Sequence, residues 1–264
     1  MKVGICSIIW KDRMDIFDVI DTARRVGAEG IEVWGQAPHI PDPQDLQHVT
    51  GLAKAMKEVG LSAPQYGSYA RVGSDDFFET LAADLAITQK LNSPAMRIWA
   101  GSQDSEDTTI EQWETLIADL REACDIVSNQ GVLLTLERHA NTVTNTLWGC
   151  QRVLDEVAHD ALKINFQTAS PATSRIAEEI RILQPHILNI HAQNSTNTEK
   201  GREGRSLADG DVDWAATIEA LKGVGWDGFI EIEFVRRGTG ELPLDELEKE
   251  LAADIAYIRE CWNK

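Results

Sequence analysis

The segment TIEQWETLIADLREACDIVSNQ (109–130), followed by one glycine and then VLLTLERHA (132–140), contains the unit that decides the fold. In the first part, apolar residues recur at spacings of three and four, as in an amphipathic helix. The second part is a short apolar run of the kind that forms a buried strand. The glycine between them is typical of a helix end and turn. The segment therefore predicts a helix that leads into a buried strand.

This unit recurs about once every 30 residues along the chain. The apolar runs are VGICSIIW (3–10), GIEVWG (30–35), LSAPQYGSY (61–69), AMRIWAG (95–101), VLLTLERHA (132–140), LKINFQTA (162–169), ILNIHAQN (187–194) and FIEIEF (229–234). Eight strands that alternate with helices, such as the one expected at 244–262, indicate a parallel sheet covered by helices.

The length of 264 residues favours closure of this sheet into a (β/α)₈ TIM barrel, a single domain over residues 1–264. The competing arrangement is a doubly wound open sheet. No glycine-rich phosphate fingerprint follows the first run, which argues against that alternative.

The composition excludes several classes of partner. The formal net charge is -18, and an acidic surface repels nucleic-acid phosphates and anionic membranes. No run reaches the roughly 18 apolar residues of a membrane span, and the N-terminal run lacks a small-residue cleavage site. The four cysteines form no CxxC or Cys/His cluster. We therefore expect a cytoplasmic protein with free thiols, a small-molecule substrate, no nucleic acid and no membrane; a homo-oligomer stays open.

Polar residues gather near the ends of the predicted strands. Side chains two apart share a face of a strand, and catalytic groups of such barrels lie at the C-terminal strand ends. The residues that share a face in this way are Glu32 and Trp34, Arg97 and Trp99, Glu137 and His139, Asn165 and Gln167, Asn189, His191 and Gln193, and Glu231 and Glu233. We therefore expect one polar site at this end of the barrel.

Within this set, Glu137, Gln167, His191 and Glu233 form a candidate metal site. Charged side chains are rarely buried unless they are paired or bind a metal. Oxygen ligands with one imidazole suit Mn²⁺ or Mg²⁺ best, and Zn²⁺ or Co²⁺ are possible. The alternative is that Arg97, Arg138 or water satisfies these groups.

At these residues the chain resembles the xylose-isomerase-like barrel superfamily of sugar isomerases, epimerases and lyases, and most of all its 3-dehydroshikimate dehydratases. The resemblance is carried by GICSIIW, GIEVWG, MRIWAGSQDS, LLTLERHANTVTNT, LKINF, ILNIHAQN and FIEIEF. It implies a metal held by Glu137, Gln167, His191 and Glu233, with His139 as an acid or base. It also implies that Arg97 binds a substrate carboxylate.

Three positions differ from the dehydratase pattern. Gln167 stands where that family has Asp, Ser170 where it has His, and Gln193 where it has Lys. A neutral amide still offers a carbonyl oxygen, so we expect weaker metal binding.

The chemistry that this superfamily shares is removal of a proton from carbon next to a carbonyl. We therefore expect a metal-dependent sugar isomerase or epimerase in which Glu137, His139 and Glu233 carry the proton transfers. The alternatives are a 3-dehydroshikimate-type dehydratase and a degenerate barrel that binds a ligand without turnover. An AP endonuclease shares the fold, but six histidines and an acidic chain fit it poorly.

Further residues are expected to contact the substrate. Trp10 and Trp34 lie near the ends of predicted strands. His39 lies in the loop after the second apolar run, and Gln193 lies in the seventh apolar run. The segment 194–214 is expected to be a polar loop, and Lys200, Arg202 and Arg205 form a basic cluster there that would attract an anionic substrate.

Overall fold

In the computed structural model, which describes residues 1–236 and 242–264, eight parallel strands form a closed barrel. The strands are β1 (Lys2–Cys6), β2 (Gly30–Trp34), β3 (Tyr66–Arg71), β4 (Ala95–Trp99), β5 (Leu133–Glu137), β6 (Leu162–Phe166), β7 (Ile187–Ala192) and β10 (Phe229–Ile232). Each strand pairs with its neighbours along the chain, and β10 pairs with β1 to close the ring. The predicted TIM barrel is confirmed and the open sheet is excluded.

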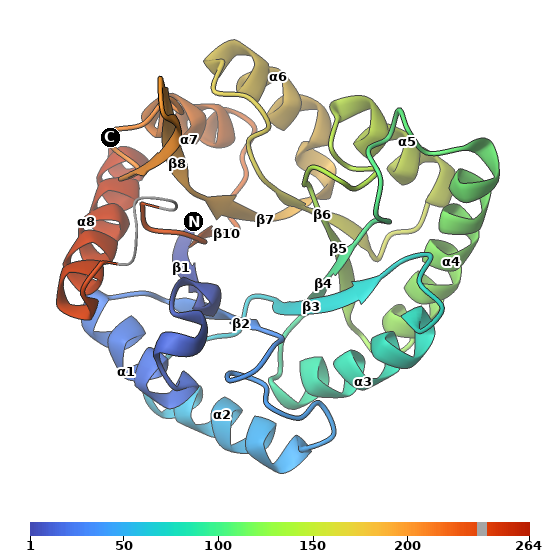
Figure 1. Ribbon diagram of the computed structural model, residues 1–264, viewed down its shortest axis with the longest axis horizontal. Helices are drawn as coiled ribbons and strands as arrows, with labels where there is room; N and C mark the ends of the chain where they lie inside the picture. The colour runs from blue at the N-terminus through green and yellow to red at the C-terminus, as the bar shows by residue number, and fades with distance from the viewer. Residues whose placement is uncertain (237–241) are drawn as a thin grey trace.

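Helices surround the strands as an outer ring (Figure 1). They are α1 (Ile16–Val26), α2 (Leu46–Glu58), α3 (Phe77–Lys90), α4 (Ile110–Ser128), α5 (Leu147–Val157), α6 (Thr173–Leu183), α7 (Trp214–Gly223) and α8 (Leu244–Asn263). Short 3₁₀ helices are η1 (Ser7–Ile9), η2 (Lys11–Arg13) and η3 (Gln184–His186). The helix predicted at 109–130 is α4, whose first turn is fixed by a capping box between Thr109 and Gln112.

Two sequence predictions need correction. The third strand is β3, at Tyr66–Arg71, because residues 61–65 make only a single bridge between Ser62 and Gly30. The segment 194–214 is not only a loop. Its first part pairs with itself as the antiparallel hairpin of β8 (Asn194–Thr198) and β9 (Gly201–Arg205), because Gly201 adopts positive φ and lets the chain reverse.

The two faces of the barrel strands have different environments. Apolar residues such as Ile31, Val33 and Leu136 are fully buried in the hydrophobic core. The alternate residues, together with Gln65 directly before β3, form a polar interior. All are at most 3% exposed: Glu32, Gln65, Arg97, Thr135, Asn165, Asn189, His191 and Glu231. The alternation of the strands therefore places the polar residues inside the barrel, as predicted.

Gly67 makes room for this interior. A Cβ atom at this position would lie 2.7 Å from Glu32 Oε1 and 3.0 Å from Arg97 Nη2. Only glycine leaves space there for the two charged side chains to meet.

The cysteines and the helices bear on two further predictions. Cys6, Cys124, Cys150 and Cys261 are buried and free, as expected. Of the helices in the described ranges, none combines the length and apolarity needed to cross a lipid bilayer.

Candidate functional site

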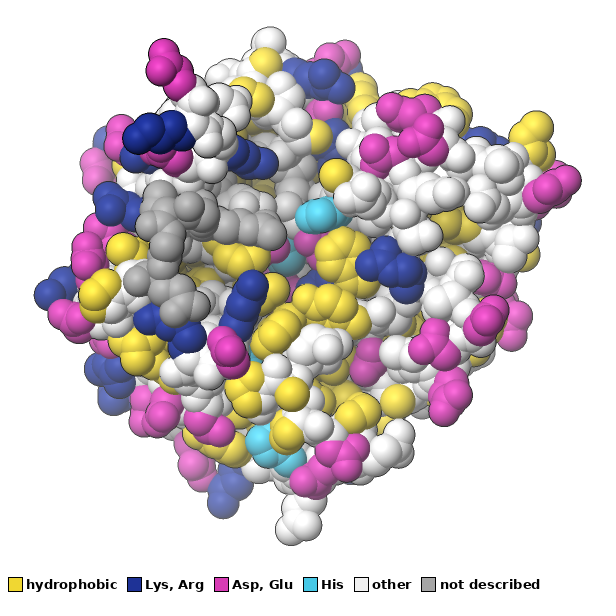
Figure 2. All heavy atoms as spheres, viewed as in Figure 1, with side chains coloured by type: hydrophobic (Ala, Val, Ile, Leu, Met, Phe, Trp, Pro, Cys, Tyr) yellow, Lys and Arg dark blue, Asp and Glu magenta, His cyan; other side chains and the backbone are white. Residues whose placement is uncertain are grey.

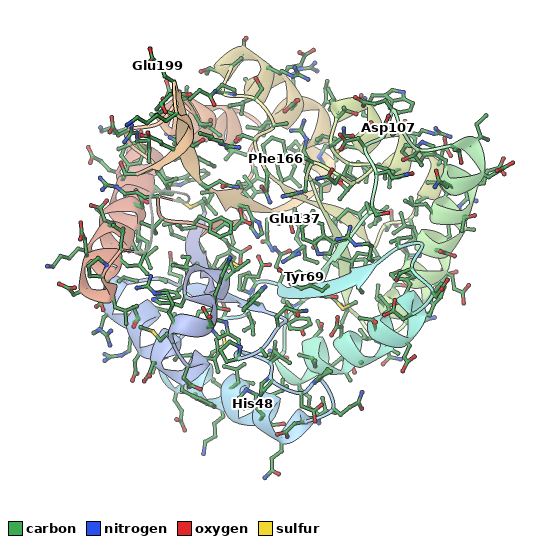
Figure 3. The ribbon with its side chains drawn as sticks, viewed as in Figure 1. His48, Tyr69, Asp107, Glu137, Phe166 and Glu199 are labelled. Atoms are coloured by element: carbon green, nitrogen blue, oxygen red, sulfur yellow. The ribbon has the colours of Figure 1, made fainter. Side chains whose placement is uncertain are left out.

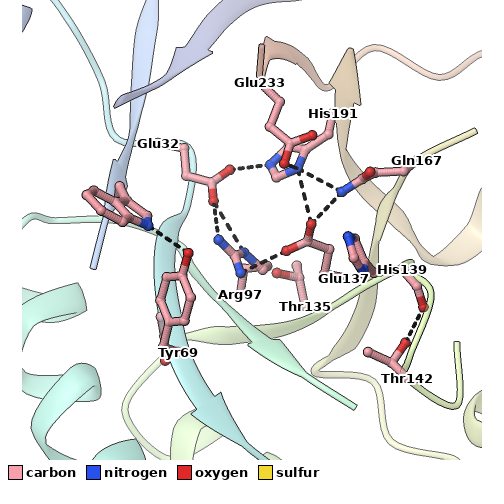
Figure 4. Close-up of polar contacts among 12 residues, drawn as sticks. Glu32, Tyr69, Arg97, Thr135, Glu137, His139, Thr142, Gln167, His191 and Glu233 are labelled. Carbon is pink, nitrogen blue, oxygen red and sulfur yellow. Dashed lines mark hydrogen bonds and ion pairs between the residues drawn. The ribbon is translucent and has the colours of Figure 1, made fainter. Parts of the chain in front are cut away.

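Arg97 connects two buried glutamates in the barrel interior (Figure 4). Its Nη2 lies 3.2 Å from Glu32 Oε1, and its Nη1 lies 2.8 Å from Glu137 Oε2. The three side chains are 0–3% exposed. Arg97 was expected to bind a substrate carboxylate, but here its guanidinium is paired with two carboxylates of the protein.

His191 lies between two groups of carboxylates, one on each ring nitrogen. On the side of Nε2, Glu32 Oε2 is 2.5 Å away, within hydrogen-bonding distance. Gln65 supports this contact, since its Nε2 donates to Glu32 Oε2 at 2.8 Å and to Glu231 Oε2 at 3.3 Å. Gln65 in turn accepts from Thr135 Oγ1 at 2.9 Å, so a chain of hydrogen bonds supports the Nε2 side of the ring.

On the side of Nδ1, the carboxylates stand further off. Glu137 Oε1 lies 3.7 Å from His191 Nδ1, and Glu233 Oε1 lies 3.8 Å from it. Potential ligand atoms of these three residues lie within 4.8 Å of one another. The strands β6 and β7 separate β5 from β10 in the ring, so the two glutamates reach this point from different sides.

Two amides cover the carboxylates. Gln167 Nε2 donates to Glu137 Oε1 and lies 3.2 Å from His191 Nδ1. Gln193 Nε2 donates to Gln167 Oε1 at 3.2 Å and to Glu233 Oε2 at 2.9 Å. The predicted set Glu137, Gln167, His191, Gln193 and Glu233 is therefore brought together.

The buried charges shift one another's protonation. Burial would raise the pKa of Glu137, but Arg97 and His191 outweigh it and lower that pKa to about 2. Burial would lower the pKa of His191, but Glu32 and Glu233 raise it well above its usual value. Burial and the nearby Glu32 raise the pKa of Glu231 well above its usual range. The interior therefore favours a charged Glu137 and a neutral Glu231.

A cavity of about 600 Å³ opens above these residues. Among the described residues, its lining is Arg138, His139, Ala140, Asn145, Gln167, Thr168, Ala169, Gln193, Asn194, Ser195 and Arg202. Gln167 and Gln193 therefore belong both to the cavity wall and to the carboxylate cluster. In Figure 3, Glu137 points toward the centre of the barrel, whereas His48 lies at the periphery on α2.

His139 is half-buried in the cavity wall. Its Nδ1 lies 2.6 Å from the carbonyl oxygen of Ala140, and its ring packs edge-on against Trp99 with centroids 5.2 Å apart. A hydrogen on Nδ1 that is donated to this carbonyl leaves the lone pair of the neutral ring on Nε2.

Besides Arg97, three residues expected to contact the substrate lie outside the cavity lining. Trp10 is 1% exposed and packs in the core. His39 is fully buried, with its ring nitrogens 2.9 Å from Ser7 Oγ and 3.3 Å from the carbonyl oxygen of Met14. Trp34 is half-buried and donates to the Tyr69 hydroxyl at 2.7 Å. Their roles toward a substrate stay predictions.

Sequence reasoning did not assign roles to three residues that the structure places at the centre. Glu32 and Glu231 share the inner face with the predicted site residues, which was the available signal. Gln65 gave no such signal, because its segment precedes the strand that actually forms.

The donor set on the Nδ1 side fits a divalent cation. It offers one imidazole nitrogen and two carboxylates whose ligand atoms lie close together. Gln167 directs its amide nitrogen at Glu137 and His191, and its amide oxygen accepts from Gln193. Glu32 on the opposite ring nitrogen fits as well, because metal-binding histidines commonly donate their second N–H to a carboxylate.

Comparison with known proteins agrees with the fold. The family model described as xylose isomerase-like TIM barrel matches residues 20–261. A 3-dehydroshikimate dehydratase of Bacillus anthracis is 26% identical over 206 residues, covering 75% of this chain and 74% of that protein.

Two solved structures share the whole architecture. The probable 3-DHS dehydratase involved in petrobactin synthesis from Bacillus anthracis has a TM-score of 0.82 at 20% identity, covering 98% of this chain and 99% of that one. The D-psicose 3-epimerase with D-tagatose from Clostridium cellulolyticum H10 has a TM-score of 0.77 at 18% identity, covering 99% of both chains. These relatives are enzymes, as the sequence resemblance implied.

Proposed function

The chain belongs to the xylose isomerase-like TIM barrel family, and we propose on this premise that it removes a proton from carbon next to a carbonyl group of a small polyhydroxylated compound. The observation that carries the proposal is the convergence of Glu137, His191 and Glu233 beside the cavity wall formed by Gln167 and Gln193. We propose an isomerase or epimerase, which returns the proton to a different carbon or face.

We further propose that Glu137, His191 and Glu233 hold a divalent cation, Mn²⁺ or Mg²⁺ by the chemistry of the donors. Gln167 would be the fourth ligand once its amide turns its oxygen from Gln193 toward these residues. Such a cation supplies Lewis-acid stabilisation of the negative charge that develops on a carbonyl oxygen. The hydrogen bond from His191 Nε2 to Glu32 would keep the lone pair on Nδ1, on the side of the two carboxylates.

The proton transfers belong to residues on different sides of the site. His139 Nε2 carries the ring's lone pair and has no hydrogen-bond partner among the described residues, so it is suited to accept a proton from a substrate in the cavity. Glu137 and Glu233 reach the site from β5 and from the end of β10, and either is a second group that can hold or return a proton. An epimerase needs two such groups on opposite faces of the carbon.

The test follows the proposed step itself. The protein with Mn²⁺ is incubated in D₂O with a panel of ketoses and with 3-dehydroshikimate, and deuterium uptake next to the carbonyl is measured by mass spectrometry. We expect uptake in at least one compound, and His139→Ala should slow it by about 10²- to 10⁴-fold.

The matched control is His159→Ala. His159 accepts from the backbone N–H of Ala161 far from the cavity, so its loss should leave the exchange rate unchanged. Equal rates for His139→Ala and the unchanged protein would eliminate the role of His139, and no exchange in any compound would contradict the proposed step.

A second candidate is a 3-dehydroshikimate dehydratase-type lyase, which expels a neighbouring hydroxyl after the same proton removal. The relative of that name at 26% identity favours it. Formation of an aromatic product from 3-dehydroshikimate, followed by ultraviolet absorbance, would select the lyase over the isomerase.

A third candidate is a barrel that binds a ligand without turnover. It is favoured by Arg97, Gln167 and Gln193, which already satisfy the carboxylates of Glu137 and Glu233. A cation that binds only the folded chain raises its stability, by about 2.7 kcal/mol at one hundred times its dissociation constant. No rise in melting temperature with Mn²⁺, Mg²⁺, Zn²⁺ or Co²⁺ would support this candidate.

A further inference from the structure

The lining of the cavity has a charge opposite to that of the chain. The protein carries a formal net charge of -18, yet the described residues that line its 600 Å³ cavity include Arg138, Arg202 and His139 and no Asp or Glu. Figure 2 shows most acidic side chains around the periphery of this face. An acidic protein that keeps carboxylates out of the lining of one cavity is suited to bind an anion there.

The two arginines of the lining differ in their partners. Arg138 is neutralised, because its Nη1 lies 2.6 Å and its Nη2 2.8 Å from the two oxygens of the buried Glu179. Arg202, on β9, makes no ion pair with a carboxylate of the described residues. Its Nε donates to Ser195 Oγ at 2.5 Å, which orients the guanidinium and leaves its terminal nitrogens without a hydrogen-bonded partner in that part of the chain.

Asp211 is an acidic residue near Arg202. Asp211 lies close enough to attract it, but that carboxylate already accepts from Thr196 Oγ1 at 2.7 Å and from the backbone N–H of Asn197 at 3.1 Å. Asp211 lines the smaller neighbouring cavity and not the main one. Arg202 lines both, so it stands at their boundary.

We propose that the substrate carries a single carboxylate group and that Arg202 of the β8–β9 hairpin binds it. This inference rests on the proposed function and names its substrate class. A guanidinium without an ion pair among the described residues matches one negative charge, and the paired N–H groups of arginine suit the two oxygens of a carboxylate. Arg97 is occupied by Glu32 and Glu137 and is only 3% exposed, so the hairpin supplies the accessible cation.

The test measures binding, not turnover, so it stands apart from the test of the proposed function. The probes are 3,4-dihydroxybenzoate and catechol, which differ only by the carboxylate, and their affinities are measured by isothermal titration calorimetry. We expect the unchanged protein to bind the carboxylate probe at least tenfold more tightly, as a charge-assisted hydrogen bond provides. In Arg202→Met that preference should vanish while catechol affinity stays the same.

Two further variants sharpen the result. Arg202→Lys keeps the charge without the paired donors and should retain only part of the preference. Arg205→Met is the matched control, because Arg205 pairs with Glu203 at 3.1 Å and lies outside the cavity lining, and it should retain the full preference. Far-ultraviolet circular dichroism checks that each variant is folded.

Several outcomes would overturn the proposal. These are no preference for the carboxylate probe in the unchanged protein, including no binding of either probe, and an Arg202→Met variant that keeps the preference. Inorganic phosphate that displaces the carboxylate probe at a lower concentration than acetate does would assign the site to phosphate esters instead, which also contradicts the carboxylate.

Discussion

Each ring nitrogen of His191 faces a pair of glutamates, and the two pairs differ in their distance from the ring. Glu32 Oε2 lies 2.5 Å from Nε2, and Gln65 donates hydrogen bonds to both Glu32 and Glu231. The nearest oxygens of Glu137 and Glu233 lie 3.7 and 3.8 Å from Nδ1. On the first side a carboxylate bonds the ring directly, deep in the barrel. On the second side the carboxylates stand off, and the Gln167 amide nitrogen lies 3.2 Å from Nδ1 at the cavity wall. The comparison teaches that one histidine can be held by the fold on one side and be available to a ligand on the other.

The largest effect should come from removing the residue that joins the two sides. Arg97 pairs with Glu32 on one side and Glu137 on the other, so Arg97→Met leaves two buried carboxylates without their cation. We expect the free energy of unfolding to fall by about 3–5 kcal/mol, measured by urea denaturation.

The control for Arg97 is Arg25→Met. Arg25 pairs with Glu248 at 2.8 Å on the surface, where such pairs contribute about 0–1 kcal/mol. Similar losses in the two variants would mean that the interior ion pairs do not hold the two sides of His191 together.

A smaller effect is expected from Glu32→Gln, which changes only the group on the Nε2 side of His191. Glutamine cannot accept the Nε2 hydrogen of His191 as strongly as a carboxylate does. The metal affinity of the proposed site on the Nδ1 side should therefore fall about 10- to 100-fold. Isothermal titration with Mn²⁺ measures it. Glu231→Gln is the matched control, because Glu231 makes no hydrogen bond to His191 among the described contacts and the interior already favours its neutral form. Equal losses in both variants would refute the distinction between the two glutamates.

The smallest effect concerns a buried carboxylate that makes no ion pair with a described residue. Burial raises the pKa of Asp84, on α3, to about 6, and hydrogen bonds from Ser68 and Tyr66 only partly offset this. Its pKa is therefore higher in the folded chain than in the unfolded chain, so its contribution to stability is present at low pH and is lost as the pH rises from about 4 to 6.

The corresponding variant is Asp84→Asn. Between pH 4 and 6 its unfolding free energy should gain roughly 1–2 kcal/mol relative to the unchanged protein. The pKa of Glu137 is lowered to about 2 beside Arg97, so its contribution is lost only as the pH falls below about 4 toward 2. Urea denaturation at both pH values measures the difference, and a constant difference would show that Asp84 does not titrate in this range.

The strand residues of the site were predictable because the period of a strand is regular. Glu137 and His191 lie on strands whose alternation places them inside, and the register of a closed parallel barrel brings the strand ends to one face. Where a strand was misplaced, as at 61–69, the residue that supports Glu32, Gln65, was missed.

Loop residues were harder to place. His39 follows β2 and looked suited to the cavity, but the loop folds back so that its ring contacts Ser7 and Met14. Trp10 likewise packs in the core, because large apolar side chains near a strand end are stabilised by burial as readily as by a ligand. Sequence periodicity has no bearing on the path of such segments.

The sequence by itself determined the barrel and the inner face of each strand, because both follow from local patterns of apolar and polar residues. Only the tertiary structure decided which charges meet. It pairs Arg97 with Glu32 and Glu137, and it folds 194–205 into a hairpin that brings Arg202 to the cavity. The physical reason is that electrostatic contacts depend on distances between residues far apart in the chain, and these distances exist only once the ring of strands has closed.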